Sequence, residues 1–257
     1  MRVLLASIVC EPDELEGNLA CHIDLLRQGR AEGCDLAVFP EFSLTGSVDP
    51  LRHPERAVAV DHDAVQRLVA ASDRLGVPAL FGIGERDGDA FYITQVYAAG
   101  GQIVGVQRKR HLGEDEVGYA VSDESTLFEL GAFRFGAVIC AEARVDFTWD
   151  ASADAGAHAT FLCSAPGLYG RRTDPASLRA GFEWWESRGL ADARAQAKRC
   201  GLWVGMATQA GSTLDEDFPG ISALVSPAGE VVDRLPDWAP GVLVTDIPAD
   251  VAVEPPD

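Results

Sequence analysis

The chain has 257 residues, of which 47% are hydrophobic and 24% are charged, a composition typical of a globular protein that buries a sizeable core. Its 40 acidic residues outnumber its 21 basic ones and give a net charge of −19, which argues against nucleic acid and anionic membrane surfaces as partners. No apolar run approaches the roughly 20 residues that span a membrane. The short apolar start is followed at once by acidic residues, so we interpret it as a buried strand rather than a signal peptide and expect a cytoplasmic protein.

Buried apolar strands alternate with helices in the first half of the chain. Strands are expected at 3–9, 36–39 and about 78–83, where apolar and β-branched residues run together. Helices are expected at 13–33, with leucine and isoleucine at helical spacing, and at about 63–75. This alternation favours an α/β layered fold.

The second half is predicted to contain more strands, several of them paired as hairpins. Glycines mark turns in three segments, 91–107, 128–139 and 221–235, and predict a hairpin in each. The other predicted elements are strands at 160–163, 202–208 and 242–247 and a helix over 175–199 with a break near Gly189.

Two hairpin sequences resemble each other: residues 98–104 (AAGGQIV) and residues 226–232 (SPAGEVV). Such an echo fits two similar sheets that face each other. No linker or low-complexity segment divides the chain, so we expect one domain over residues 1–257. The tail after about residue 248, with its two prolines, is expected to be extended, over the surface or against a partner subunit.

Six cysteines are scattered along the chain without a pairing pattern. None lies in a C-x-x-C pair or in a Cys/His spacing suited to zinc, so no metal site is predicted. In a cytoplasmic protein most of them should be reduced thiols, several buried as small apolar side chains. They are Cys10, Cys21, Cys34, Cys140, Cys163 and Cys200.

Three chemically useful side chains follow predicted strands directly. Glu41 comes after the strand that stops at Pro40, Lys109 after a strand at 103–108, and Cys140 after a strand at 135–139. Ligand sites of open α/β sheets gather beyond the carboxyl ends of strands, so the three can converge on one site. Taken singly, each also fits an ordinary role as a solvated glutamate, a surface lysine or a buried cysteine.

The residues around these three positions resemble the motifs of the nitrilase superfamily of carbon–nitrogen hydrolases. The order and spacing agree, and the similarity covers nearly the whole chain. The matching segments are Phe39-Pro40-Glu41 with Leu44-Thr45-Gly46, Arg108-Lys109-x-His111-Leu112, Ile139-Cys140-x-Glu142-x-Arg144, Leu15 to Leu19, Ala193 to Ala195, and Gly220 to Ser222 with Pro227-x-Gly229.

The resemblance implies a four-layer αββα sandwich whose subunits form homodimers or higher even oligomers, with no metal or organic cofactor. It also implies a triad of Glu41, Lys109 and Cys140. A second glutamate usually follows the lysine, and Glu116 fits that spacing best, with Glu114 as the alternative. Lys109 and the backbone N–H of Ala141 would hold the oxyanion.

Other residues are weaker candidates around the site. Family members often continue from the cysteine with Tyr-Asp-x-Arg-Phe-Pro-Glu, whereas this chain has a small Ala141 in place of the aromatic residue. Because of this difference, the substrate of a named subfamily cannot be assigned to this chain from the resemblance. We expect Glu142 and Arg144 to form a structural pair after Cys140, and Arg171 or Arg172 to lie in a solvated loop or to bind a substrate carboxylate. The candidates for substrate contact are Tyr119, Glu142, Cys163, Arg171 and Arg172, with Trp149 and Trp184 as further pocket residues.

The predicted function is hydrolysis of a small amide or N-carbamoyl compound through a thioester on Cys140. Nitrile hydrolysis, acyl transfer on the same triad, and a non-catalytic binding protein on the same fold are the alternatives. A papain-like Cys–His pair would need a histidine partner, and none of the five histidines lies in a motif for that role.

Overall fold

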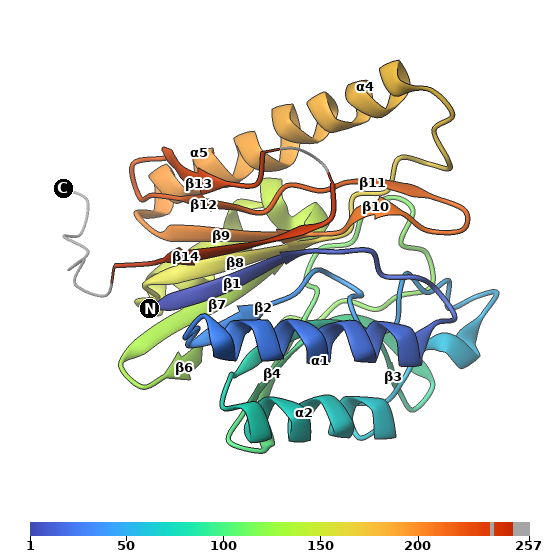
Figure 1. Cartoon of the computed structure of the whole chain (residues 1–257), viewed down its shortest axis with the longest axis horizontal. Helices are drawn as coiled ribbons and strands as arrows, with labels where there is room; N and C mark the ends of the chain where they lie inside the picture. Colours follow the sequence, from blue (N-terminus) through green and yellow to red (C-terminus); the bar gives the residue numbers. More distant parts are fainter. Residues whose placement is uncertain (237–238, 249–257) are drawn as a thin grey trace.

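The protein folds into two stacked six-stranded sheets with helices on both outer faces, as the computed structural model shows for residues 1–236 and 239–248 (Figure 1). This arrangement confirms the predicted αββα sandwich. In their order across the first sheet, the strands are β14 (Gly241–Asp246), β1 (Arg2–Ser7), β2 (Leu36–Val38), β3 (Ala79–Asp87), β4 (Ala90–Ala99) and β5 (Gln102–Arg108). Its outer face carries α1 (Leu15–Ala31) and α2 (Asp63–Leu75).

The second sheet and its helices come from the later part of the chain. Its strands, again in spatial order, are β13 (Val231–Arg234), β12 (Ala223–Val225), β9 (Trp203–Thr208), β8 (Ala159–Ser164), β7 (Phe133–Ile139) and β6 (Phe128–Leu130). The helices on its outer face are α3 (Asp146–Asp154), α4 (Pro175–Trp185) and α5 (Ala191–Cys200). Other elements are a separate two-stranded ribbon of β10 (Ala210–Ser212) and β11 (Asp217–Pro219) and short 3-10 turns at Pro54–Arg56 and Cys140–Arg144.

The two sheets have the same internal topology. In each sheet three parallel strands (β1-β2-β3 and β7-β8-β9) continue into an antiparallel pair (β4-β5 and β12-β13), and an antiparallel strand closes the other edge (β14 and β6). The hairpins at 98–104 and 226–232 therefore occupy equivalent edges of two similar sheets. The sequence echo between them has this structural counterpart.

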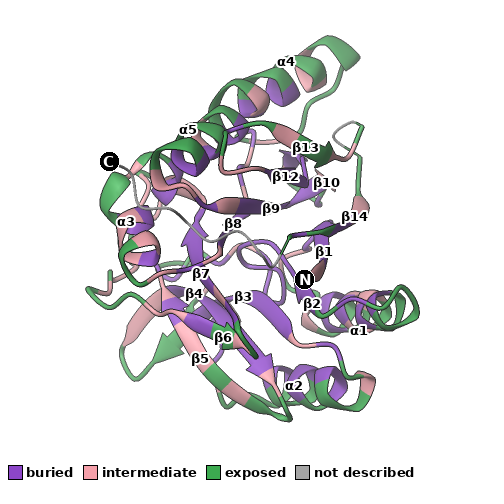
Figure 2. Ribbon diagram, turned by 90° about the vertical axis from the view of Figure 1, so that its left-hand side faces the viewer, coloured by how far each residue is buried: buried purple, intermediate pink, exposed green. Residues whose placement is uncertain are grey.

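Aromatic side chains fill much of the space between the sheets. Tyr97 and Phe128 from one end of the sandwich pack against Phe135, with ring centroids 5.1 and 5.4 Å from Phe135, and Phe161 completes the group at 5.4 Å. All four are essentially buried. Figure 2 shows the same pattern along whole strands: buried residues occupy the inner layers and exposed residues the outer faces of the helices.

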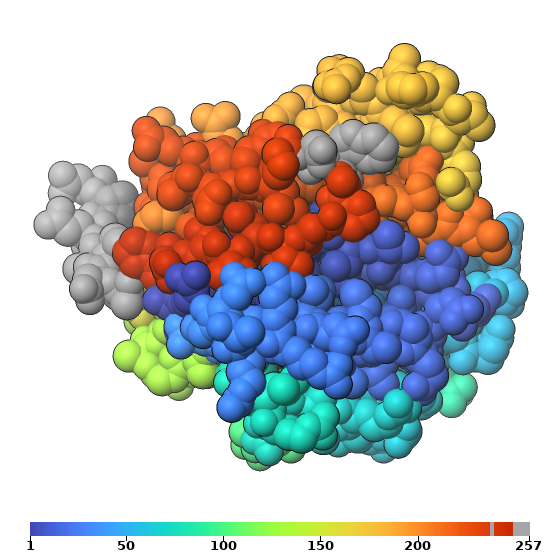
Figure 3. Space-filling view, viewed as in Figure 1, coloured from blue at the N-terminus to red at the C-terminus, as the bar shows by residue number. Residues whose placement is uncertain are grey.

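The last strand among the described residues, β14, forms one edge of the first sheet. β14 pairs antiparallel with β1 from Arg2 opposite Asp246 to Ser7 opposite Gly241, as predicted for the segment 242–247. In the space-filling view, the C-terminal strands (red) meet the first half of the chain (blue) along a seam across the visible face (Figure 3). Within residues 1–236 and 239–248, no helix has the length and apolar character required to traverse a bilayer.

Several predicted elements have the expected limits and others do not. The helix at 63–75 and all three hairpins are confirmed, whereas α3 and the β10–β11 ribbon were not predicted. The predicted break near Gly189 is confirmed: a π-helical turn, Glu186–Leu190, separates α4 from α5. Gly189 is needed there because a Cβ would collide with the Trp185 ring. The predicted extended tail after residue 248 lies outside the described residues.

Candidate active site

Glu41 lies in a tight loop after β2, and this loop packs against β3. Its side chain is 2% exposed. The next residue, Phe42, has a φ of +56°, and the Ser43 hydroxyl accepts a hydrogen bond of 2.9 Å from the Gly82 N–H. Gly82 allows this close approach because a Cβ there would lie 2.6 Å from the Pro40 carbonyl oxygen. The loop is thus shaped by a β3 residue distant in sequence.

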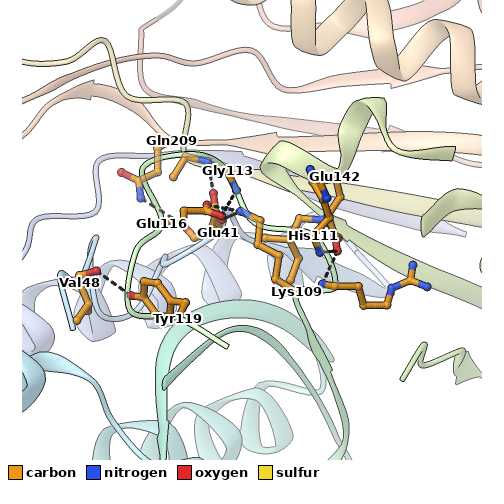
Figure 4. Close-up of polar contacts among 12 residues, drawn as sticks. Glu41, Val48, Lys109, His111, Gly113, Glu116, Tyr119, Glu142 and Gln209 are labelled. Carbon is orange, nitrogen blue, oxygen red and sulfur yellow. Dashed lines mark hydrogen bonds and ion pairs between the residues drawn. The ribbon is translucent and has the colours of Figure 1, made fainter. Parts of the chain in front are cut away.

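Lys109 follows β5 and is completely buried. Its Nζ donates to Glu41 Oε1 at 2.7 Å and also to Glu116 Oε1, as Figure 4 shows. The second Glu116 oxygen accepts the Gly113 N–H at 2.6 Å. Glu114 is exposed, so Glu116 is the second glutamate that meets the lysine.

Cys140 sits where β7 turns into a 3-10 helix. Its φ of +43° is unusual for a residue other than glycine, and such backbone strain is often found at functional sites. The thiol hydrogen-bonds the Glu41 carboxyl and is also close to Lys109 and Glu116. The three strand-end residues singled out in the sequence are therefore brought together.

Burial and mutual charge control the protonation of these groups. Burial raises the pKa of the Glu41 carboxyl, the Lys109 charge opposes this rise, and the Glu116 charge adds to it. Burial alone would lower the pKa of Lys109, but the charges of Glu41, Cys140 and Glu116 raise it overall. Burial, followed by the Glu41 charge, raises the pKa of Cys140 well above its usual value. The raised pKa of the thiol favours its protonated form and the raised pKa of Lys109 favours the ammonium, so the Glu41 carboxyl beside them is suited to proton transfer during attack.

Ala165, in the loop after β8, and Gln209, which was not predicted as a site residue, support the Glu41 side chain and backbone. The Ala165 N–H donates to Glu41 Oε2 at 3.0 Å, and the Gln209 amide Nε2 donates to the Glu41 carbonyl at 3.2 Å. Ala165 directly follows β8 and Gln209 directly follows β9. The strand-end rule that pointed to the other three residues contained the signal for these two as well.

The predicted role of Glu142 needs correction. Its side chain is fully buried, and its two oxygens accept backbone N–H groups of Arg110, His111 and Ile139, so it is not placed to contact a substrate. The predicted pair with Arg144 is not formed either: Arg144 is exposed and lies near Asp192. Backbone amides, rather than a guanidinium, satisfy the Glu142 carboxylate.

The remaining pocket candidates lie at different depths. Tyr119, like Cys140, packs against the apolar cluster of Phe42, Ile93 and Ile139, and its hydroxyl donates to the Val48 carbonyl at 2.8 Å. Cys163 is fully buried in the core between the sheets, and burial raises its pKa, so its placement contradicts a substrate contact. Trp149 is also fully buried, whereas Trp184 is 40% exposed on α4.

The two arginines of the 164–172 loop are held by the β10–β11 ribbon. Arg171 forms an ion pair with Asp217 at 3.1 Å and donates to the Thr213 carbonyl at 2.8 Å. Arg172 donates its backbone N–H to Asp217 and its guanidinium to the Leu168 carbonyl. These bonds stabilise the loop and leave the Arg171 side chain 49% exposed. Within the described residues, no cluster of three or more His, Cys, Asp or Glu side chains could hold a metal ion.

A buried histidine fixes the start of the Glu41 loop. His22 Nδ1 lies 2.7 Å from the Asn18 carbonyl oxygen and Nε2 lies 3.0 Å from the Ser43 hydroxyl. The carbonyl can only accept, so Nδ1 carries the proton and the Ser43 hydroxyl donates to Nε2. This neutral tautomer satisfies both ring nitrogens and leaves the imidazole no role as a base for Cys140.

We expect the conformational stability to fall as pH drops below 6.5, in part through His22. Burial lowers the pKa of His22 to about 4 from its ordinary 6.5, so between these values the unfolded chain binds a proton that the folded chain excludes. The contribution is about 2 kcal/mol between pH 7.5 and pH 5. Urea unfolding at both pH values should show this loss reduced in His22→Gln but retained in the partly exposed control His53→Gln. An equal pH dependence in His22→Gln and wild type would contradict the assignment.

Substitution of Gly82 by alanine should disturb the Glu41 loop. The added Cβ would press against backbone atoms, which cannot move aside as a flexible side chain can. We expect a loss of about 1–3 kcal/mol of stability. Gly29→Ala is the matched control, because a Cβ there meets only ordinary contacts of 3.5 Å or more. Thermal unfolding tests both variants; a Gly82→Ala protein as stable as the control would refute the expectation.

Comparisons with known proteins agree with this geometry. The family model of carbon–nitrogen hydrolases matches residues 4–254. An aliphatic nitrilase of Rhodococcus rhodochrous is 30% identical in an alignment of 138 residues that covers 47% of this chain and 38% of that protein. One of Sinorhizobium fredii is 29% identical in an alignment of 152 residues that covers 51% of this chain and 49% of that protein. The alignments thus span half or less of these relatives' length.

Solved structures show the same fold. The crystal structure of an amidase from Nesterenkonia sp. superimposes with a TM-score of 0.81 at 22% identity, covering 96% of this chain and 90% of that one. At this identity the likeness concerns the fold, while the family match extends over nearly the whole sequence. The chain therefore belongs to the carbon–nitrogen hydrolase family, the nitrilase superfamily.

Proposed function

We propose that this protein hydrolyses a non-peptide carbon–nitrogen bond in a small amide or N-carbamoyl compound, through a thioester on Cys140. The observation that carries the proposal is the buried contact of the Lys109 ammonium with both Glu41 and Glu116. The Cys140 thiol is hydrogen-bonded to the same Glu41 carboxyl. This set contains a nucleophile, a base and a cation within one water-poor site.

The first half-reaction begins with attack of the Cys140 sulfur on the carbonyl carbon. Glu41 takes the thiol proton as the S–C bond forms, because the resting thiol keeps that proton. The carbonyl oxygen becomes an oxyanion, which the Lys109 ammonium and the Ala141 N–H would stabilise. Glu41 then gives the proton to the leaving nitrogen, the C–N bond breaks, and ammonia or an amine departs.

The second half-reaction hydrolyses the thioester. Glu41, again a carboxylate, takes a proton from a water molecule that attacks the acyl carbon. The S–C bond breaks, the acid product leaves, and the sulfur recovers a proton from Glu41. Glu116 holds the Lys109 ammonium in place through both steps. The scheme needs no metal or organic cofactor.

An amide or N-carbamoyl substrate is favoured over a nitrile. Among the structural neighbours, variants of the Nesterenkonia amidase have been crystallised in complex with acrylamide and with butyramide. The aliphatic nitrilases are similar to only about half of this chain. A small substrate also suits a site whose glutamate and lysine are buried.

The test is ammonia release from a panel of short primary amides, N-carbamoyl amino acids and amines, and nitriles. The Cys140→Ala variant supplies the background. Release by the wild type that disappears in this variant supports the thioester route and identifies the substrate class. Equal release by both proteins would remove Cys140 as the nucleophile, and release from nitriles alone would overturn the amide proposal.

A further inference from the structure

A single buried carboxylate connects the two segments that carry Lys109 and Cys140. Glu142 Oε1 accepts the backbone N–H groups of Arg110 at 2.6 Å and His111 at 3.2 Å. Its Oε2 accepts the N–H of Ile139 at 2.8 Å. Arg110 and His111 directly follow Lys109, and Ile139 directly precedes Cys140, so one side chain joins the segments that carry the two reactive residues. Figure 4 shows Glu142 beside His111 and Lys109.

The chemistry of a carboxylate suits this position. Both of its oxygens accept hydrogen bonds and neither donates, so it can satisfy three N–H groups that converge from two segments. A glutamine in the same place has one accepting oxygen and an NH₂ group, which would face an N–H. Glu142 is fully buried, and a buried charge without hydrogen-bond partners costs free energy. Moving either segment away from the carboxylate would remove such a partner, so the charge resists displacement of both segments.

The backbone of Glu142 is itself anchored. Its carbonyl accepts the Thr148 hydroxyl and the Trp149 indole N–H, both at 3.2 Å. These residues belong to α3, which packs on the outer face of the second sheet. The carboxylate therefore extends from a rigid support, as a group that sets the geometry of a site must.

We infer that Glu142 is a positioning residue, which sets the separation of the Lys109 ammonium from the Cys140 sulfur and aligns the neighbouring Ala141 N–H. The effect on catalysis rests on the proposed function, but the placement of Lys109 beside Cys140 can be measured separately, through the reactivity of the thiol. A cation beside a thiol favours the thiolate, so a displaced Lys109 makes Cys140 harder to ionise and slower to alkylate at a given pH.

The test compares Glu142→Gln with Glu85→Gln, a matched loss of a buried carboxylate that binds Arg108 and Thr94 instead of backbone amides. Iodoacetamide alkylation of Cys140 is followed across pH by mass spectrometry of the tryptic peptide 135–144. Glu142→Gln should shift the alkylation profile upward by about one pH unit and reduce kcat about 10- to 100-fold, with KM changed much less. Glu85→Gln should leave the alkylation profile and kcat close to wild type, even where it lowers Tm.

Each outcome decides the matter. A Glu142→Gln protein that is destabilised like Glu85→Gln, with an unchanged alkylation profile and kcat, would show a merely structural role. If no C–N substrate is found but the alkylation profile shifts, the proposed function fails while the positioning of Lys109 and Cys140 stands. Should Glu142→Gln not fold, Glu142→Asp retains the charge but cannot span both segments, and it must show the same upward shift relative to Glu85→Asp.

Discussion

Replacing Glu41 with glutamine is expected to lower kcat/KM for amide hydrolysis by about 10²- to 10⁴-fold, the range that general acid–base catalysis contributes. The amide side chain cannot take the thiol proton, and it cannot activate water against the thioester. Its oxygen can still accept from Lys109 or from the Ala165 N–H, so the fold should survive with a loss of about 1–3 kcal/mol. Ammonia release and thermal unfolding measure the two effects. Activity within a few-fold of wild type would mean that another group serves as the base.

The pH profile gives a second check on Glu41. Because burial raises its pKa above 4.5, wild-type kcat/KM should fall as pH drops through this raised value and the base becomes protonated. The residual activity of Glu41→Gln should lack this acid limb, since the amide does not titrate. An acid limb of the same midpoint in both proteins would belong to a different group.

Replacing Lys109 with methionine is expected to abolish measurable activity and to destabilise the fold by about 3–5 kcal/mol. The ammonium is completely buried between Glu41 and Glu116, so its removal leaves two carboxylates close together without a cation. Urea unfolding at pH 7.5 should show the full loss. The deficit should shrink as pH falls, because protonation relieves the repulsion between the carboxylates.

The chain has only one other lysine, Lys198, which is exposed on α5. Lys198→Met is therefore the matched control and should retain wild-type activity with a change in stability of about 0.5 kcal/mol or less. Equal free energies of unfolding for Lys109→Met and Lys198→Met would show that the buried contacts of Lys109 do not stabilise the fold.

The sequence by itself determined the features that depend on local pattern. The limits of α2 follow from helical spacing, and the hairpin of β4 and β5 follows from the double glycine between two strands. Glu41, Lys109 and Cys140 were identifiable because each ends a strand, and because the residues around them match a family pattern. The sequence pattern did not show whether the side chains near these three residues point into the site or away from it.

Only the tertiary structure decided which groups meet. It selected Glu116 over Glu114, because the path of the loop after Lys109 brings one carboxylate inward and leaves the other exposed. It also turned Glu142 toward backbone amides that come from two separate segments. Such contacts join residues far apart in the chain, and their free energy depends on burial and geometry that no local pattern contains. Strand ends could therefore be predicted from the sequence, whereas the hydrogen-bond network that makes them one site arose from packing the two sheets together.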